Sequence, residues 1–171
     1  MGETLPGSEV MSAESFCAFY RTYLPSVYGY LLRLCAGDRA QAEDLTQDVW
    51  FALVDELNHG HVERADVRWL MSVARSRFVD HARRERLVRS KLALLRRVDR
   101  QDAGDSTRSE VLAHLAGVQP LHRAVLVLRY VDDLPVSEVA ATIGRDLTAT
   151  NSLLARARAE LRRRDRGDSD D

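Results

Sequence analysis

The sequence is poor in the features that mark secreted and membrane proteins. It has only two cysteines in 171 residues, and Cys17 and Cys35 lie in apolar, helix-periodic surroundings and not in a C-x-x-C pair, so we expect two buried, reduced thiols. No run of about eighteen apolar residues is present. The N-terminal stretch MGETLPGSEVMSAES has acids but no basic residue and no hydrophobic segment. These absences argue against export and against membrane insertion, and we expect a cytoplasmic protein.

An excess of one charge sign is also absent. The chain has 25 basic and 26 acidic residues and a net charge of −1, so its total charge does not indicate a nucleic-acid partner. Only the distribution of the charges is informative. Lysine is nearly missing, since Lys91 is the only one. The other basic side chains are arginines, whose guanidinium groups suit bidentate binding of phosphate.

Signals for β-strands are almost absent as well. Apolar residues recur at spacings of three and four, without sustained period-two alternation. The sequence therefore predicts an all-α fold of two small helical domains joined by a flexible linker. In the first domain we expect a helix capped by Ser12, a helix from Pro25 to Gly37, a helix from Asp38 to about Leu57, a loop to Ala65 and a long helix from Asp66.

Charge and composition divide the chain. From Arg75 to Arg100 there are ten basic and three acidic residues, a net charge of +7, so the long helix becomes basic toward its end. The next stretch, RQDAGDSTRS, has no apolar stripe, as expected of a linker. The acidic end DRGDSDD has two interpretations, a solvated terminus or a segment that weakens nonspecific adsorption to DNA. We assign residues 1–12 to a disordered N-terminus, 13–99 to the first domain, 100–109 to the linker, 110–164 to the second domain and 165–171 to an acidic tail.

The second domain contains the spacing of a helix-turn-helix. Two helices that cross steeply need a small residue where they touch, and glycine is favoured in the turn. Ala140 and Gly144 are placed for these roles. The positions expected to point inward are Val139, Ile143, Leu147, Thr150 and Leu153. This domain is therefore predicted to bind DNA.

A helical projection separates two faces of the last helix. The core face gathers Thr150, Leu153, Leu154, Ala157 and Leu161. The opposite face begins with small polar residues that can hydrogen-bond base edges, and it continues with arginines that either reach phosphates or simply suit the helix C-terminus. The candidate DNA-binding residues are Arg145, Thr148, Asn151, Ser152, Ala155, Arg156, Arg158 and Arg162.

The helix before the loop carries an unusual acidic face. Leu45, Val49, Ala52 and Leu53 form the expected core stripe, and Asp44, Gln47, Asp48, Phe51 and Asp55 form a second stripe roughly opposite. From Ala40 to Glu56 there are five acids and no base. Acids alone would indicate a solvated face. A phenylalanine among outward carboxylates instead favours a docking surface for a basic, partly apolar partner.

Three stretches together resemble a known family. They are AEDLTQDVWFAL, VRWLMSVARSRFVDHARRER and LPVSEVAATIGRDLTATNSLLARARAELR. From Phe16 to Arg164 the chain resembles bacterial RNA polymerase sigma factors of the extracytoplasmic-function (ECF) group. In that family the D-L-x-Q-(D/E)-x-(F/W) pattern, here Asp44 to Trp50, docks on the clamp helices of the largest catalytic subunit of core RNA polymerase. The implied polymerase-binding residues are Asp44, Leu45, Gln47, Asp48, Val49, Phe51 and Asp55.

The resemblance also implies that the first domain melts and captures the −10 promoter element, and that the second recognises the −35 element. The implied −10 contacts are Asn58, His61, Arg64, Trp69, Arg75, Ser76, Asp80, Arg83 and Arg84. Unstacked bases need a pocket and a cationic track. Trp69 has two interpretations, a stacking platform for a base or a core anchor. The family further implies an anti-sigma factor as a partner.

The chain departs from the family pattern at two places. Ser76 stands where relatives commonly have asparagine. The stretch from Thr148 to Leu154 stands where many relatives have G-T-V-K-S-R-L, so a lysine and an arginine are lost. We therefore expect a different −35 sequence.

Two other functions fit the sequence less well. An enzyme would need His59, His61 or His81 as metal ligands, but no partner cysteine or carboxylate stands at ligand spacing, and no glycine-rich phosphate loop or G-x-S-x-G motif occurs. We expect no enzymatic activity, metal or cofactor. The alternative is a stand-alone helix-turn-helix transcriptional regulator that binds palindromic DNA as a dimer. The acidic face and the basic long helix do not follow from that role.

Overall fold

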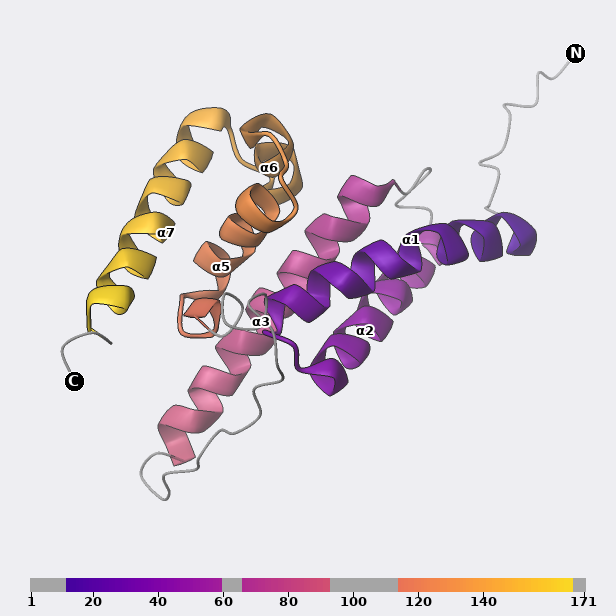
Figure 1. Ribbon diagram of the computed structural model, residues 1–171. Helices are drawn as coiled ribbons and strands as arrows, with labels where there is room; N and C mark the ends of the chain where they lie inside the picture. Colours follow the sequence, from indigo (N-terminus) through magenta and orange to yellow (C-terminus); the bar gives the residue numbers. More distant parts are fainter. Residues whose placement is uncertain (1–11, 60–65, 93–113, 168–171) are drawn as a thin grey trace, which may run out of the picture.

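The computed structural model describes residues 12–59, 66–92 and 114–167. Every regular element within these ranges is helical, and none is a strand (Figure 1). The expectation of an all-α fold is thus confirmed. The segments expected to be the disordered N-terminus and the linker, together with His61 and Arg64, lie outside the described residues, apart from Ser12 at the end of the N-terminal segment.

The first helix, α1, runs without interruption from Ala13 to Leu34. Ser12 caps it as expected, since its side chain accepts a hydrogen bond of 3.2 Å from the backbone N–H of Ser15. The expectation that Pro25 begins a separate helix was wrong, because Pro25 lies inside α1. An interior proline costs about 3 kcal/mol or more. Packing on both sides of it offsets this cost.

The two halves of α1 pack in different ways. Before Pro25, the rings of Phe16, Phe19 and Tyr20 surround Trp50, with centroids 6.4, 6.2 and 4.6 Å away. After it, Tyr30 and Leu31 are fully buried. Aromatic contacts of this kind add to simple burial, so each half of α1 has its own reason to remain helical.

Two more helices complete the first bundle. Helix α2 spans Arg39–Asn58, and its cap is Asp38, whose Oδ1 accepts a 3.0 Å hydrogen bond from the N–H of Gln41. Helix α3 spans Val67–Leu92, and Asp66 accepts at 2.8 Å from the N–H of Trp69. The bundle buries apolar residues from all three helices, among them Leu34, Leu45, Leu53, Leu70 and Phe78.

The second bundle follows residue 114. Helix α5 (Pro120–Leu126) runs directly into the π-helical turn η1 (Val127–Val131), and α6 (Val136–Ile143) and α7 (Leu147–Gly167) follow. The predicted turn is confirmed, since Gly144 ends α6 with φ 65° and ψ 39°, a left-handed conformation that glycine adopts without strain. Helix α7 continues to Gly167, into the segment expected to be the tail.

Leu147 does not point into the core as expected. It is the first residue of α7 and is 53% exposed, whereas Thr150, one turn later, is fully buried. Helical periodicity places Leu147 near the inward direction. Periodicity does not show which distant residues cover the first turn of α7, and that is why the prediction failed.

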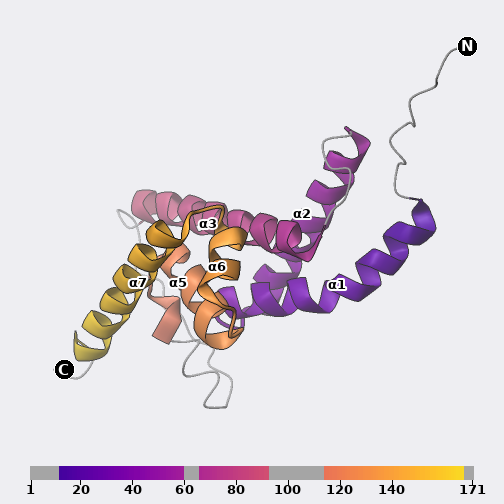
Figure 2. The same cartoon turned by 90° about the horizontal axis from the view of Figure 1, so that it is seen from above.

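The two bundles pack against each other. Helices α1 and α3 contact α5, and α3 also contacts α6 (Figures 1 and 2). Arg123 of α5 donates a 2.7 Å hydrogen bond to the backbone carbonyl of Leu34, and its guanidinium lies 5.4 Å from the centre of the Phe78 ring. Arg33 and Asp132 form an ion pair of 2.5 Å. The sequence did not predict this arrangement.

The two free cysteines differ in their surroundings. Cys35 is buried, and burial raises the pKa of its thiol to about 12, so it stays protonated at neutral pH. Cys17 is exposed, and the expectation that it is buried was wrong. No helix among the described residues is long and apolar enough to cross a membrane.

Reversal of the Arg33–Asp132 pair tests the contact between the bundles. Arg33→Asp or Asp132→Arg sets like charges opposite each other across a largely buried contact, at a cost on the order of 1–3 kcal/mol. We expect each single variant to increase the radius of gyration in small-angle X-ray scattering, and the double reversal to restore it. Arg21→Asp, on the same helix but without this partner, is the control. An unchanged radius in both single variants would contradict the arrangement.

Candidate polymerase and nucleic-acid interfaces

The acidic face of α2 consists of Asp44, Gln47, Asp48, Phe51 and Asp55, and every one of these residues is exposed. Phe51 is 71% exposed, although it is the most apolar of the five. Burial of the opposite stripe holds this face outward, since Leu45 is 2% exposed and Val49 is fully buried. Leu45 and Val49 lie buried beneath this face, and their assignment as polymerase-binding residues stays a prediction. They position the face from beneath.

A shallow hollow adjoins Phe51. Val54, which the sequence analysis missed, is 38% exposed beside it, and Arg77 of α3 contributes the one basic side chain of the lining. The lining residues are Asp48, Phe51, Ala52, Val54, Asp55, Asn58 and Arg77. The end of α2 and the middle of α3 are thus adjacent, although they are far apart in the sequence.

The residues implied in −10 recognition do not form one uniform surface. Asn58, Ser76, Asp80, Arg83 and Arg84 are exposed. Trp69 is half-buried and packs against the hydrophobic core, which favours its interpretation as a core anchor. His61 and Arg64 lie outside the described residues.

Arg75 occupies a different position from the other arginines of α3. It lies four residues after Met71 and three before Phe78, so all three share one side of the helix. That side faces the second bundle, because Met71 lines a cavity with Leu128 and Leu134, and Phe78 lies beneath the guanidinium of Arg123. Arg75 is half-buried, and its Nε atom is covered.

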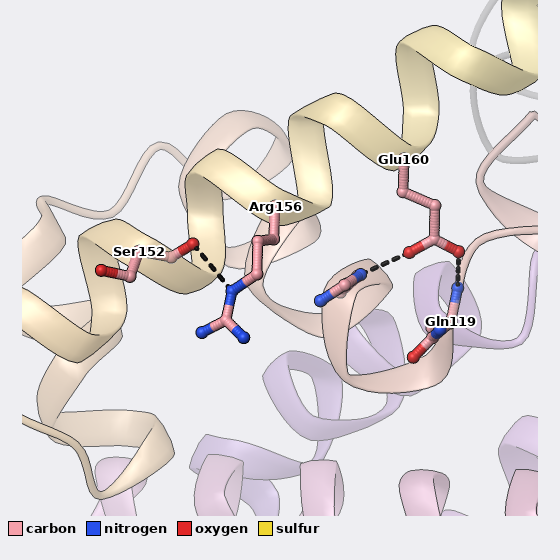
Figure 3. Close-up of polar contacts among 5 residues, drawn as sticks. Gln119, Ser152, Arg156 and Glu160 are labelled. Carbon is pink, nitrogen blue, oxygen red and sulfur yellow. Dashed lines mark hydrogen bonds and ion pairs between the residues drawn. The ribbon is translucent and has the colours of Figure 1, made fainter.

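The outward face of α7 is as projected. Every candidate residue on it is exposed, as is Arg145 in the turn before α7: Thr148, Asn151, Ser152, Ala155, Arg156, Arg158 and Arg162. The opposite positions Leu153, Leu154 and Ala157 are buried. The side chain of Arg156 turns back along the helix, where its Nε donates a 3.3 Å hydrogen bond to the carbonyl of Ser152 (Figure 3). Its charge therefore lies next to the small polar residues near the start of α7.

Glu160 fastens α7 to α5. Its Oε1 accepts a 2.9 Å hydrogen bond from the backbone N–H of Gln119, and its Oε2 pairs with Nδ1 of His122 (Figure 3). Gln119 is the N-cap of α5 and makes no side-chain cap hydrogen bond, and the carboxylate from α7 satisfies the backbone N–H of this residue and places negative charge at the start of α5. Burial alone would raise the pKa of Glu160, but the hydrogen bonds from His122 and Gln119 hold it below its usual value. The partners are 38 and 41 residues away, so no local pattern could have indicated this contact.

The histidines considered as metal ligands have other hydrogen-bond partners where the structure describes them. Nδ1 of His81 lies 2.8 Å from Nε2 of Gln41, and Nδ1 of His59 lies 2.8 Å from the carbonyl oxygen of Asp55. Within the described parts of the chain, no group of three or more His, Cys, Asp or Glu side chains could hold a metal ion.

Two family models match the chain. Residues 19–88 match sigma-70 region 2, and residues 109–161 match sigma-70, region 4. The chain belongs to the sigma-70 family. Its similarity to curated ECF RNA polymerase sigma factors places it in the ECF group.

The similar sigma factors come from several bacteria. SigX of Bacillus subtilis is 25% identical over 76% of this chain and 73% of its own length. BldN of Streptomyces coelicolor is 25% identical over 95% of this chain and 65% of its own length. SigE of Mycolicibacterium smegmatis is 30% identical over 83% of this chain and 58% of its own length.

Solved structures agree in fold. The sigma factor RpoE of Bartonella quintana, crystallised with the anti-sigma factor NepR, has a TM-score of 0.66 and 17% identity, over 88% of this chain and 96% of RpoE. CnrH, solved with the cytosolic domain of CnrY, has a TM-score of 0.62 and 20% identity, over 94% of each chain.

The family match assigns the two bundles of this sigma factor. Region 2 covers most of the first bundle, including the acidic face, and region 4 covers α5, η1, α6 and most of α7. Sigma factors bind core RNA polymerase and direct it to promoters, and this is the function that the family assigns to the chain.

Glu160→Gln tests the fastening of α7 in this sigma factor. A folded-state pKa below the unfolded value means that the carboxylate stabilises the fold above the unfolded pKa, and that this stability is lost as pH falls through the folded pKa. At neutral pH we expect the variant to lose about 1–3 kcal/mol, and the difference from wild type to shrink as the solution is acidified below the usual pKa of a glutamate. Urea unfolding at a series of pH values measures this. Glu43→Gln is the control, and a difference that does not depend on pH would count against the contact.

Proposed function

We propose that this sigma factor docks on core RNA polymerase through the acidic face of α2, reads the −10 element with the end of α2 and with α3, and reads the −35 element with α7. The observation that carries the proposal is Phe51, a 71% exposed phenylalanine between the exposed carboxylates of Asp48 and Asp55. This arrangement does not stabilise the isolated protein. It fits a basic partner that has an apolar groove.

The docking surface combines two kinds of interaction. Covering Phe51 and Val54 removes apolar area from water, at about 25 cal/mol per Å². The carboxylates of Asp44, Asp48 and Asp55 steer a basic partner toward the surface and set its orientation. The clamp helices of the largest catalytic subunit are the partner that the family resemblance implies.

The −10 surface is proposed to follow α3 from the hollow beside α2. Asn58 and Arg77 meet at that hollow, and Arg83 and Arg84 lie exposed further along the helix. Exposed arginines of this kind can bind the phosphates of a single-stranded backbone. Arg75 is half-buried, so less of its side chain is available to this surface.

On the −35 surface, base recognition and phosphate binding are assigned to different residues. Thr148, Asn151 and Ser152 can hydrogen-bond base edges, and arginines further along α7 can contact phosphates. The first turns of α7 contain no lysine. Weak binding by each bundle suffices once polymerase holds both on one promoter, because the second contact is then intramolecular.

An anti-sigma factor belongs to the proposal as a second protein partner. RpoE was crystallised with the anti-sigma factor NepR, and it shares the fold of this chain. A partner of this kind would compete with polymerase if it covered the acidic face. A promoter-DNA mobility shift with and without core polymerase tests whether DNA binding depends on the polymerase.

Reversal of charge on the acidic face tests the docking proposal. Asp44→Arg with Asp48→Arg should abolish promoter-dependent transcription and leave the melting temperature nearly unchanged, because both side chains are exposed and off the core. Run-off transcription with core polymerase measures the effect. Glu14→Arg, which adds positive charge on α1 and away from this face, should remain active. Normal transcription by the Asp44/Asp48 double variant would refute the assignment.

Asn151→Ala tests the −35 assignment. If Asn151 makes a bidentate contact with a base, its loss should cost about 1–3 kcal/mol of discrimination at one or two positions of the element. Selection from a randomised promoter library shows the change. Exposed Ala141→Ser on α6 is the control for substitution near the turn, and an unchanged preference would remove Asn151 from the reading surface.

A further inference from the structure

Leu147 is an exposed apolar side chain at the start of α7. It is 53% exposed and lies outside the core that holds α6 and α7 together. The carboxylate before it, Asp146, is occupied as the helix cap, since it accepts a 2.7 Å hydrogen bond from the N–H of Ala149. The tip of α7 therefore presents a branched hydrocarbon.

Leu147 is also next to the residues assigned to base reading. Asn151 follows it by four residues, so the two side chains are neighbours on one side of the helix. A helical side chain leans toward the N-terminus, and Leu147 accordingly extends the exposed surface past the helix end. In helix-turn-helix proteins, the N-terminal residues of the second helix are those that contact base edges in the major groove.

A leucine can distinguish bases in the major groove by only one chemical feature. It neither donates nor accepts hydrogen bonds, and the apolar group on base edges in that groove is the C5-methyl of thymine. Contact with this methyl removes apolar area of both partners from water. Exposed hydrocarbon at this tip thus fits a thymine better than any other base.

We propose that Leu147 is a specificity-determining residue that reads thymine in the −35 element through its C5-methyl group. The proposal rests on the proposed function of α7. It divides the reading between two neighbours, with Asn151 recognising hydrogen-bonding groups and Leu147 recognising a methyl. It also gives the start of α7 a source of discrimination that requires no cation.

Replacement of thymine by deoxyuridine tests the proposal at the level of one methyl group. The preferred −35 element is first selected from a randomised library with wild-type holoenzyme, and each of its thymines is then replaced singly. Deoxyuridine keeps the hydrogen-bonding groups of thymine. We expect the affinity of the wild-type holoenzyme to fall about fourfold at one or two positions, and the Leu147→Ala holoenzyme to show no difference between the two bases there.

Three variants serve as controls. Asn151→Ala should keep the deoxyuridine penalty, because it removes a different contact. Leu147→Met should retain most of it, since an apolar side chain remains. Leu147→Ala should melt at the wild-type temperature, because the side chain is more than half exposed.

Several results would overturn the proposal. One is a selected element in which the wild type tolerates deoxyuridine at every thymine, and another is a penalty that persists in Leu147→Ala. Weaker binding of Leu147→Ala to core polymerase without DNA would assign the residue to a protein contact instead. A wild-type chain that forms no initiating holoenzyme would refute the proposed function itself, and with it this inference, whereas normal initiation without a methyl effect refutes the inference alone.

Discussion

Burial of one apolar stripe on each helix is the constraint on which both interfaces depend. On α2, the stripe of Leu45, Val49 and Leu53 must face α1 and α3, and this leaves the carboxylates and Phe51 in solvent. On α7, burial of Thr150, Leu153 and Leu154 turns the reading residues outward in the same way. The functional faces are thus the reverse sides of packing faces. A change in the core would move them.

Polar contacts over long sequence distances set how these helices lie relative to one another. Arg123 binds the carbonyl that ends α1, and Arg33 pairs with Asp132 beyond η1. Glu160 holds α7 on the start of α5 from the end opposite to its reading surface. Buried charged contacts of this kind fix the relative orientation of the helices, and their net contribution to stability is often small.

Local chemistry accounts for what the sequence predicted correctly. Ser12 and Asp38 cap helices because their short side chains reach free backbone N–H groups, and Gly144 ends α6 because glycine adopts positive φ without strain. The same local rules failed at Pro25, Cys17 and Leu147. At each of these positions the outcome depends on which distant residues cover the helix, and periodicity does not contain that information.

The sequence by itself therefore determined the helices, their caps and the chemistry of their outward faces, because these follow from contacts within a few residues. It also contained the motifs that indicate the family, and the family implies the polymerase and the promoter as partners. Only the tertiary structure decided that the two bundles touch through Arg33, Arg123 and Asp132, that Glu160 caps α5, and that Leu147 stands free. Those features join residues far apart in the chain, and their formation depends on the packed arrangement of all the helices.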